Sequence, residues 1–380
     1  MAGWQTAGVR VLVCPDKFAG TISAIDAAAA LAEGWQAVAP GDELVRRPLS
    51  DGGPGFLAVL AAATRGRWRV VPTVDPLGRP AEGRVLLAGG TGYVESAQAC
   101  GLHLLTPAER DPKVTSSYGV GALLAGAVAA GAREVVVGLG GSATNDAGAG
   151  LLAALGAVPL DPAGHPLPPG GAALARVARL AGPPRLPRVP LVAATDVDHP
   201  LLGPDGATAT FGPQKGATGP DLRQLEAALS RFVRVVERDL PGCPAGLAGL
   251  PGAGAAGGLG AALLGLGARR VSGIGLVRRV TGLDAALATA DLVVTGEGRF
   301  DPSSVRGKLV GGVAAAARDR AVPCLVVAGQ VSVAADRAAA AGVTAAYALV
   351  DLGGVEAALT RPAEGLRALG ARLAREWSAG

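Results

Sequence analysis

Residues 134–150, EVVVGLGGSATNDAGAG, restrict the possible folds of this chain more than any other stretch. An apolar run rich in valine leads through a turn with several glycines into an alanine-rich pattern, which predicts a strand, a tight turn and a helix. Glycines let a ligand approach the backbone closely, and the first amides of a helix lack intrahelical partners, so such a turn favours an anion. The candidate binding residues in it are Gly140, Gly141, Ser142 and Asn145.

Asp146 belongs to the same turn and adds a carboxylate, which would repel a bare phosphate group. A divalent cation between the two would remove this conflict, so the turn favours phosphate bound to Mg²⁺, with Asp146 as a candidate metal ligand. The same residues also fit a plain connection in which Ser142 or Asn145 caps the helix.

The order of strand, polar turn and helix recurs near both ends of the chain, which predicts an α/β fold with a parallel sheet covered by helices. Strands are expected at residues 9–14, 43–47, 190–195, 323–329 and 344–350. Residues 67–96 instead alternate between apolar and polar side chains, and tight-turn signals separate the alternating runs. This pattern is typical of antiparallel strands. We therefore expect two domains: residues 1–75 with 280–380, and an inserted α/β domain of residues 76–279.

Several of the turns that follow predicted strands combine glycine with acidic and basic side chains. In open α/β sheets, ligands bind outside the carboxyl ends of the strands. Phosphoryl transfer needs cations to neutralise the migrating group, and carboxylates to hold Mg²⁺ or accept a proton. The candidates selected in this way are Asp16, Lys17, Asp51, Asp196, Asp198, Lys215, Glu297, Arg299, Asp301 and Lys308. Each turn taken alone also fits a solvated loop.

The charge pattern argues against nucleic acid and membrane partners. The formal net charge of +4 comes from arginines spread along the chain without a basic block. No stretch of 18 apolar residues and no signal-like N-terminus occurs, and the four cysteines are widely separated, as expected for reduced thiols. We expect a cytoplasmic protein that acts on small molecules, as a monomer or as a homo-oligomer.

Several strings resemble, in order and spacing, the bacterial glycerate kinases of the type-1 family. They include PDKFAGTISA, SDGGPGF, DPLGRP, TSSYGVGALLAGA, GLGGSATNDAGAGLLAALG, DVDHPLLGPDGATATFGPQKGA and TGEGRFDPSSVRGK, and the resemblance runs from about Val11 to Gly329. It implies phosphorylation of D-glycerate by ATP with Mg²⁺, usually at the 2-hydroxyl, giving 2-phosphoglycerate and ADP. It also implies a flavodoxin-like domain built from both chain ends and an inserted domain likened to restriction endonucleases.

Two positions depart from the family pattern. Ala19 stands where a lysine is common, while Lys17 occurs two residues earlier, and Pro54 replaces a frequent glutamate after the DGG string. Either Lys17 reaches the same anion or that contact is lost.

The expected roles follow from charge and position. Asp51 or Asp196 is expected to be the base for the glycerate hydroxyl, with Arg299 and Lys308 also at the reacting groups. Asp146 and Asp198 are the expected metal ligands. The residues expected to bind substrate or nucleotide are Asp16, Lys17, Gly140, Gly141, Ser142, Asn145, Lys215, Glu297 and Asp301.

Other readings remain open at this point. Gly138, Gly140 and Ala143 match a GxGxxA pattern after a strand, with Asp161 at a suitable distance for a ribose hydroxyl, as in an NAD-dependent oxidoreductase of a small hydroxy acid. Asp146 counts against this, because pyrophosphate would meet its unshielded carboxylate. Phosphorylation at the 3-hydroxyl and a noncatalytic sensor with a kinase-like fold are further alternatives.

Overall fold

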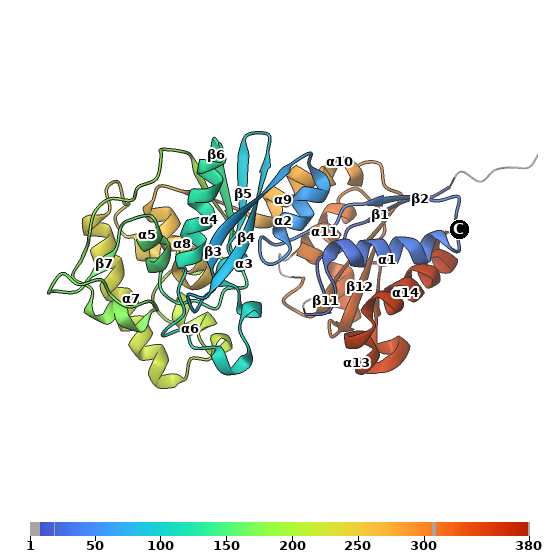
Figure 1. The fold of residues 1–380 in the computed structure, drawn as a ribbon. Helices are drawn as coiled ribbons and strands as arrows, with labels where there is room; N and C mark the ends of the chain where they lie inside the picture. Colours follow the sequence, from blue (N-terminus) through green and yellow to red (C-terminus); the bar gives the residue numbers. More distant parts are fainter. Residues whose placement is uncertain (1–7, 19, 306–308, 379–380) are drawn as a thin grey trace, which may run out of the picture. The chain divides into compact units, whose positions relative to one another are not determined.

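The computed structural model describes residues 8–18, 20–305 and 309–378. It divides into two compact units (Figure 1). The first contains the chain up to Asp51, Ala58–Ala63 and the chain from Val277 onward; the second contains Gly52–Leu57 and Thr64–Leu276. In the described part of the chain, no helix has the length and apolar character needed to cross a membrane.

The first unit is built on a five-stranded parallel sheet. Its strands are β1 (Arg10–Val13), β2 (Glu43–Arg46), β11 (Leu292–Phe300), β12 (Cys324–Val331) and β13 (Ala345–Ala348). Their spatial order is β13-β12-β11-β1-β2, and all neighbours are parallel. Numbered along the chain within this unit, the order is 2-1-3-4-5, which is the flavodoxin-like order. The predicted α/β fold with a flavodoxin-like parallel sheet from both chain ends is confirmed.

Helices at the two ends of the chain pack together in this unit. Its helices are α1 (Ala24–Gln36), α10 (Leu283–Leu287), α11 (Leu309–Arg318), α12 (Ala335–Ala340), α13 (Val350–Thr360) and α14 (Pro362–Trp377). Two further helices, α2 (Phe56–Ala63) and α9 (Gly273–Thr281), belong to it only from Ala58 and from Val277 onward, and their first residues belong to the second unit. Ser23 followed three residues later by Asp26 is a pattern typical of a helix start, and Ser23 caps α1 by accepting a hydrogen bond from the Asp26 amide. A Cβ atom on Gly34 would lie 1.9 Å from the Arg367 carbonyl oxygen, so only glycine permits the close contact of α1 with α14.

The second unit contains a mixed six-stranded sheet. Its strands are β3 (Arg67–Val74), β4 (Pro80–Ala88), β5 (Thr91–Glu95), β6 (Glu134–Gly138), β9 (Leu191–Ala194) and β10 (Arg269–Val271). Strands β10, β9, β6 and β5 are parallel, whereas β4 and β3 continue the sheet antiparallel. The antiparallel strands predicted from alternation are confirmed. Because β3 pairs along its whole length with β4, residues 67–74 belong to this sheet and not to the first domain, where the boundary expected near residue 75 would place them.

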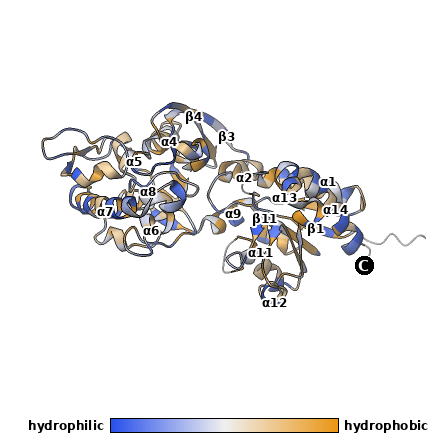
Figure 2. Ribbon diagram, turned by 90° about the horizontal axis from the view of Figure 1, so that it is seen from below, coloured by the Kyte–Doolittle hydropathy of each residue, from blue (hydrophilic) through white to orange (hydrophobic). Residues whose placement is uncertain are grey.

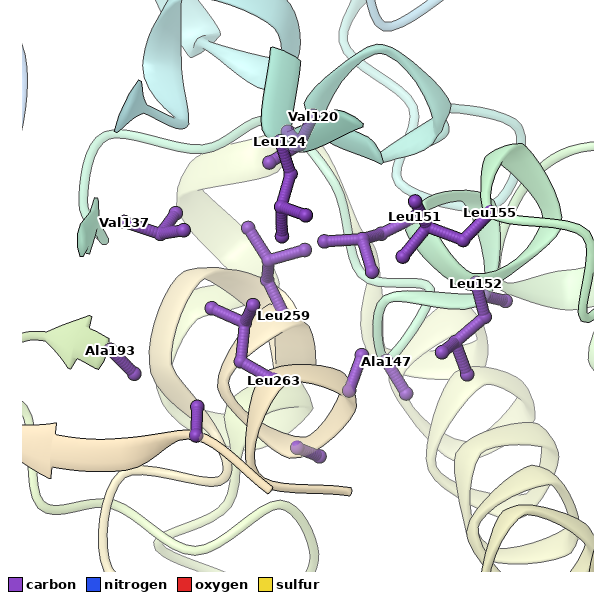
Figure 3. Packing of buried hydrophobic residues seen from close by; sticks show 14 of the residues in the cluster. Val120, Leu124, Val137, Ala147, Leu151, Leu152, Leu155, Ala193, Leu259 and Leu263 are labelled. Atoms are coloured by element: carbon purple, nitrogen blue, oxygen red, sulfur yellow. The ribbon is translucent and has the colours of Figure 1, made fainter. Parts of the chain in front are cut away.

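Helices cover this sheet and enclose the larger apolar core. They are α3 (Ala97–Cys100), α4 (Tyr118–Ala129), α5 (Ala149–Ala154), α6 (Ala207–Phe211), α7 (Gly219–Asp239) and α8 (Ala255–Gly265), with short 3-10 helices η1 (Leu102–Leu104), η2 (Pro107–Glu109), η3 (Ala172–Arg176), η4 (Pro213–Lys215) and η5 (Leu247–Gly249). Leu124 of α4, Leu151 of α5 and Leu259 of α8 point toward one another in this core (Figure 3). Helix α7 is amphipathic: Leu225 and Phe232 are buried. Hydrophilic and hydrophobic residues alternate along its ribbon (Figure 2).

Residues 157–188 are less irregular than expected from their proline and glycine content. They contain the two-stranded pair β7 (Pro159–Leu160) and β8 (Arg179–Leu180), and Leu174 and Val177 between them are buried in the core. Strands of two residues are too short to give a periodic signal, so the sequence alone predicts only a connection.

Candidate functional site

Three acidic residues meet at the carboxyl ends of neighbouring strands in the first unit. Asp16 follows β1, Asp51 follows β2, and Glu297 lies in the second half of β11. Strand β1 lies between β2 and β11, so this edge includes the point where the strand order reverses, which is where open α/β sheets bind ligands. The Asp16 amide donates to the Gly296 carbonyl oxygen at 2.8 Å and fixes the first loop to β11. We call Asp16, Lys17, Asp51 and Glu297 the sheet-edge cluster.

Lys17 supplies a positive charge to this cluster. Its Nζ lies 3.2 Å from Asp51 Oδ1 and 3.8 Å from Asp16 Oδ1, and its backbone amide donates to Asp16 Oδ1 at 2.7 Å. The Asp51 side chain is 51% exposed, whereas that of Asp16 is only 14% exposed. The two carboxylates therefore share one ammonium group but differ strongly in their access to water.

The surroundings of Asp16 change its acidity. Burial raises the pKa of the Asp16 carboxyl from 3.8 to about 7; Lys17 counteracts this, while the negative charges of Asp51 and Glu297 reinforce it. A carboxyl group with a pKa near neutrality can both accept and release a proton under ordinary conditions. The sequence identified Asp16 as a binding candidate but gave no sign of this property, because burial depends on the complete fold.

The remaining candidates of the first unit lie after β11 or within it. Arg299 is exposed near the end of β11. Asp301 organises the following turn, because its Oδ1 accepts hydrogen bonds from the Ser303 amide at 2.8 Å and the Ser303 hydroxyl at 2.5 Å. Lys308 lies outside the described residues, as does Ala19, so the structure does not place either residue.

Lys215 is the central polar group of the second unit. Its side chain is almost fully buried, and Nζ donates to Ser142 Oγ at 3.0 Å and to the Thr144 carbonyl oxygen at 2.6 Å. Burial lowers the pKa of Lys215 to about 8, although the nearby Cys100 and Asp146 counteract this. The glycine turn and Lys215, both expected from the sequence to bind substrate or nucleotide, are thus joined by direct hydrogen bonds across more than 70 residues of sequence.

Asn145 lies beside this lysine-bound turn and is completely buried. Its Nδ2 donates to Thr208 Oγ1 at 2.9 Å, while its Oδ1 has no hydrogen-bond partner among the described residues. A buried carbonyl oxygen without a partner is costly, by about 1–3 kcal/mol. Thr208, on α6, gave no signal in the sequence, because its role depends only on a contact with Asn145.

The glycines of the turn serve packing within the second unit. A Cβ atom on Gly140 would lie 2.8 Å from the Gly53 Cα, and Gly141 has a left-handed φ of +64° next to Pro54. The space above Gly140 is therefore filled by backbone. This differs from the predicted role of Gly140 and Gly141, which was to leave the backbone open to an anion.

Asp146 differs most from its expected role. Its Oδ2 accepts hydrogen bonds from the amide and hydroxyl of Ser117, both at 2.9 Å, and from the Gly150 amide at 3.1 Å, while Oδ1 accepts from the Gly148 amide at 3.1 Å. Burial raises the pKa of Asp146 although these hydrogen bonds counteract it. The carboxylate is only 1% exposed and already accepts these four hydrogen bonds, three of them at Oδ2, so its surroundings do not suit a metal ligand. The carboxylate joins the turn to α4 and α5.

The helix after the glycine turn also begins later than predicted. Helix α5 starts at Ala149, and its N-cap is Gly148 with a φ of +74°, not Ser142 or Asn145. The dinucleotide reading requires a glycine turn that opens directly into a helix. Gly138 and Gly140 lie well before the helix and pack against residues 52 and 53, so the geometry does not fit NAD binding. Asp161, the expected ribose contact, accepts the His165 amide in its own loop.

The two acidic residues after β9 have different surroundings. Asp196 holds the start of α9, because its oxygens accept hydrogen bonds from Ser272 Oγ at 2.6 Å and the Ile274 amide at 2.9 Å. Asp198 is 72% exposed and forms an ion pair with Arg270. Among the described residues, no group of three or more His, Cys, Asp or Glu side chains is arranged to hold a metal ion.

Comparisons with known proteins identify relatives of this chain. A sequence profile described as the Glycerate kinase family matches residues 11–378. The chain is 40% identical over 348 residues to a glycerate kinase of Bacillus subtilis, covering 90% of each chain, and 38% identical over 330 residues to the glycerate 2-kinase of Escherichia coli, covering 85% of this chain and 86% of that one. A crystal structure from Salmonella typhimurium LT2, assigned provisionally as glycerate kinase 2, has 36% identity and a TM-score of 0.80 and covers 98% of this chain and 99% of that one.

Proposed function

The chain belongs to the glycerate kinase family, and on that premise we propose that it transfers the terminal phosphoryl group of ATP to the 2-hydroxyl of D-glycerate, giving 2-phosphoglycerate and ADP. The choice of the 2-hydroxyl is supported by the name of the Escherichia coli relative. Within this chain, the main support for the proposal is the sheet-edge cluster, which lies where the strand order of a flavodoxin-like sheet reverses.

The cluster has the charges that the reaction needs. We propose that Lys17 and Arg299 neutralise the carboxylate of glycerate or the phosphate oxygens, and that Lys308 assists them. Glu297 and Asp301 would orient these cations at the end of β11. In the second unit, we propose that the turn of Ser142 and Asn145, held in place by Lys215, contacts substrate or nucleotide through the free acceptor of Asn145.

Magnesium would enter as part of the ATP complex, where it neutralises charge on the phosphate oxygens. Proteins commonly hold Mg²⁺ through one or two carboxylates, with phosphate oxygens and waters completing the shell. Asp198 fits this requirement because it is exposed, although it would have to exchange its partner Arg270 for the metal ion. Asp146 does not fit, for the reason given above. The free cysteines among the described residues suit a reducing compartment, and we propose that the reaction takes place in the cytoplasm.

The test is to incubate the purified protein with D-glycerate, ATP and Mg²⁺ and to follow the product by phosphorus NMR. The phosphorus of 2-phosphoglycerate couples to one proton, whereas that of 3-phosphoglycerate couples to two, so a doublet supports the proposal. A triplet would show transfer to the 3-hydroxyl. Absence of glycerate-dependent ADP formation would overturn the kinase assignment itself, and L-glycerate serves as the control for the stereochemistry.

A further inference from the structure

Asp16 has a fixed and nearly dry position at the sheet edge. Its amide is bound to Gly296 of β11, and the Lys17 amide donates to its Oδ1 at 2.7 Å. In the described part of the chain, no residue donates a hydrogen bond to its other oxygen, Oδ2. One oxygen therefore anchors the carboxylate while the other remains able to accept a proton, and the side chain keeps an exposure of 14%.

The two carboxylates that the sequence suggested as the base are differently engaged. Asp51 lies half-exposed in an ion pair with Lys17, at 3.2 Å. Both oxygens of Asp196 accept hydrogen bonds that hold Ser272 and the first turn of α9. The oxygens of Asp196 are therefore used to hold the start of α9, whereas Oδ2 of Asp16 accepts no hydrogen bond from the described residues.

The charges around Asp16 come from three elements. Lys17 lies on its own loop, Asp51 on the loop after β2, and Glu297 on β11. The two acidic neighbours disfavour a further negative charge at Asp16, and the Lys17 ammonium group opposes them. Together with burial they bring the pKa of Asp16 to about 7, which is suited to a group that must take up a proton and then lose it.

We propose that Asp16 is the general base of the phosphoryl transfer, taking the proton of the glycerate hydroxyl while that oxygen attacks the terminal phosphorus of ATP. This inference rests on the proposed function. The new bond joins the glycerate oxygen to phosphorus, and the bond from phosphorus to the β–γ bridging oxygen breaks, its electron pair leaving with ADP. The proton moves to Asp16, which releases it to solvent after the product has left.

The first experiment compares wild type with Asp16→Asn, in which Oδ1 still accepts the Lys17 amide. We expect kcat to fall about 10²–10⁴-fold with little change in KM for glycerate, because the loss is confined to proton transfer. If Asp16→Asn retains close to the wild-type kcat while wild type makes phosphoglycerate, the base assignment is wrong and the kinase assignment stands. If wild type makes no phosphoglycerate, the proposed function fails first.

The second experiment leaves Asp16 in place and uses the pH dependence of kcat/KM. In wild type this quantity should rise as pH increases through about 7, because only the ionised carboxyl can act. Asp51→Asn and Glu297→Gln each remove a repelling charge and should move this rise to lower pH, whereas Lys17→Met should move it to higher pH. The measured quantity is the pH at which kcat/KM increases, and it does not depend on the maximum value of kcat/KM in each variant. A rise that stays at the same pH in all three variants would contradict the proposal.

A third measurement does not involve turnover. Between the ordinary pKa of 3.8 and about 7, folded Asp16 keeps a proton that the unfolded chain has lost, so wild type loses stability as pH rises through this range. Asp16→Asn lacks this loss. The melting temperature of Asp16→Asn minus that of wild type should therefore increase from pH 5 to pH 8. If this difference is the same at both pH values, the burial and the charges described around Asp16 are wrong.

Discussion

At the scale of single residues, Lys215 shows how burial changes the partners and the pKa of a lysine that the sequence places in a loop. A lysine in the string GPQKGA predicts a loop contact with an anion, whereas the structure buries its ammonium group against Ser142 and the Thr144 carbonyl. No carboxylate forms an ion pair with it in the described part of the chain. A buried ammonium group without such a partner is expensive, so it indicates a place where function constrains the sequence.

Lys215 should give the protein a measurable pH dependence of stability. Its pKa is about 8 when folded and about 10.4 when unfolded, so between these values the unfolded chain holds the extra proton and stability rises with pH. We expect wild type to gain about 2 kcal/mol relative to Lys215→Met between pH 7.5 and 9.5, measured by urea unfolding. Loss of hydrogen bonds in the variant lowers stability at both pH values and does not affect this difference. Parallel pH profiles would show that Lys215 is not buried as described.

At the scale of secondary-structure elements, the start of α8 is fixed by its contact with the lysine-bound turn. Gly257 has a φ of +69°, and an added Cβ atom would lie 1.8 Å from the Thr144 carbonyl oxygen and 2.9 Å from Lys215 Nζ. The string GAGAAG, from Gly252 to Gly257, therefore reflects close packing of α8 on the turn. Its glycines are visible in the sequence, but the segment on which they pack is not.

Gly257→Ala should destabilise the second unit by about 3 kcal/mol or more, because the side chain meets backbone and the conformation is left-handed. Gly219→Ala is the matched control: Gly219 begins α7, has no left-handed φ, and an added Cβ atom meets nothing within 4 Å. We expect that control to stay within about 0.5 kcal/mol of wild type by thermal or urea unfolding. Equal stability of the two variants would contradict the packing described for α8.

At the scale of the whole molecule, the first unit needs both ends of the chain. Strand β1 pairs on one side with β2 and on the other with β11, which begins 282 residues after the start of β1. Helix α14 packs its Leu366, Leu369 and Leu373 into the core that contains Leu31 and Trp35 of α1. Burial of three leucines contributes about 5–9 kcal/mol, which is comparable to the whole stability of a domain.

Ending the chain after Arg361 removes α14 and should unfold the first unit while the second stays folded. Hydrogen exchange followed by mass spectrometry should then show fast exchange in β1, β11 and β12, with protection retained in β6 and β9. Arg367→Ala provides the control, since its exposed pair with Glu33 contributes at most about 1 kcal/mol. Retained protection in β1 and β12 would show that α14 is dispensable.

The sequence by itself determined the features that depend on neighbouring residues and on periodicity. These include the strands that alternate with helices, the Ser23 cap of α1, the antiparallel run at 67–96 and the acidic turns after β1 and β2. The flavodoxin-like order and the family followed from the resemblance of its motifs to known kinases. Such signals are carried within a few residues, where local hydrogen bonds and side-chain alternation act.

Only the tertiary structure decided what each polar side chain does. Asp146 has a structural role because Ser117 and the amides of Gly148 and Gly150 donate hydrogen bonds to it. The pKa of Asp16 is raised because the side chain is buried near two carboxylates from distant parts of the sequence. Residue type and spacing show that a charge is present, but its pKa and its partners depend on contacts between segments far apart in the chain. Those contacts and the loss of water exist only after the chain has folded.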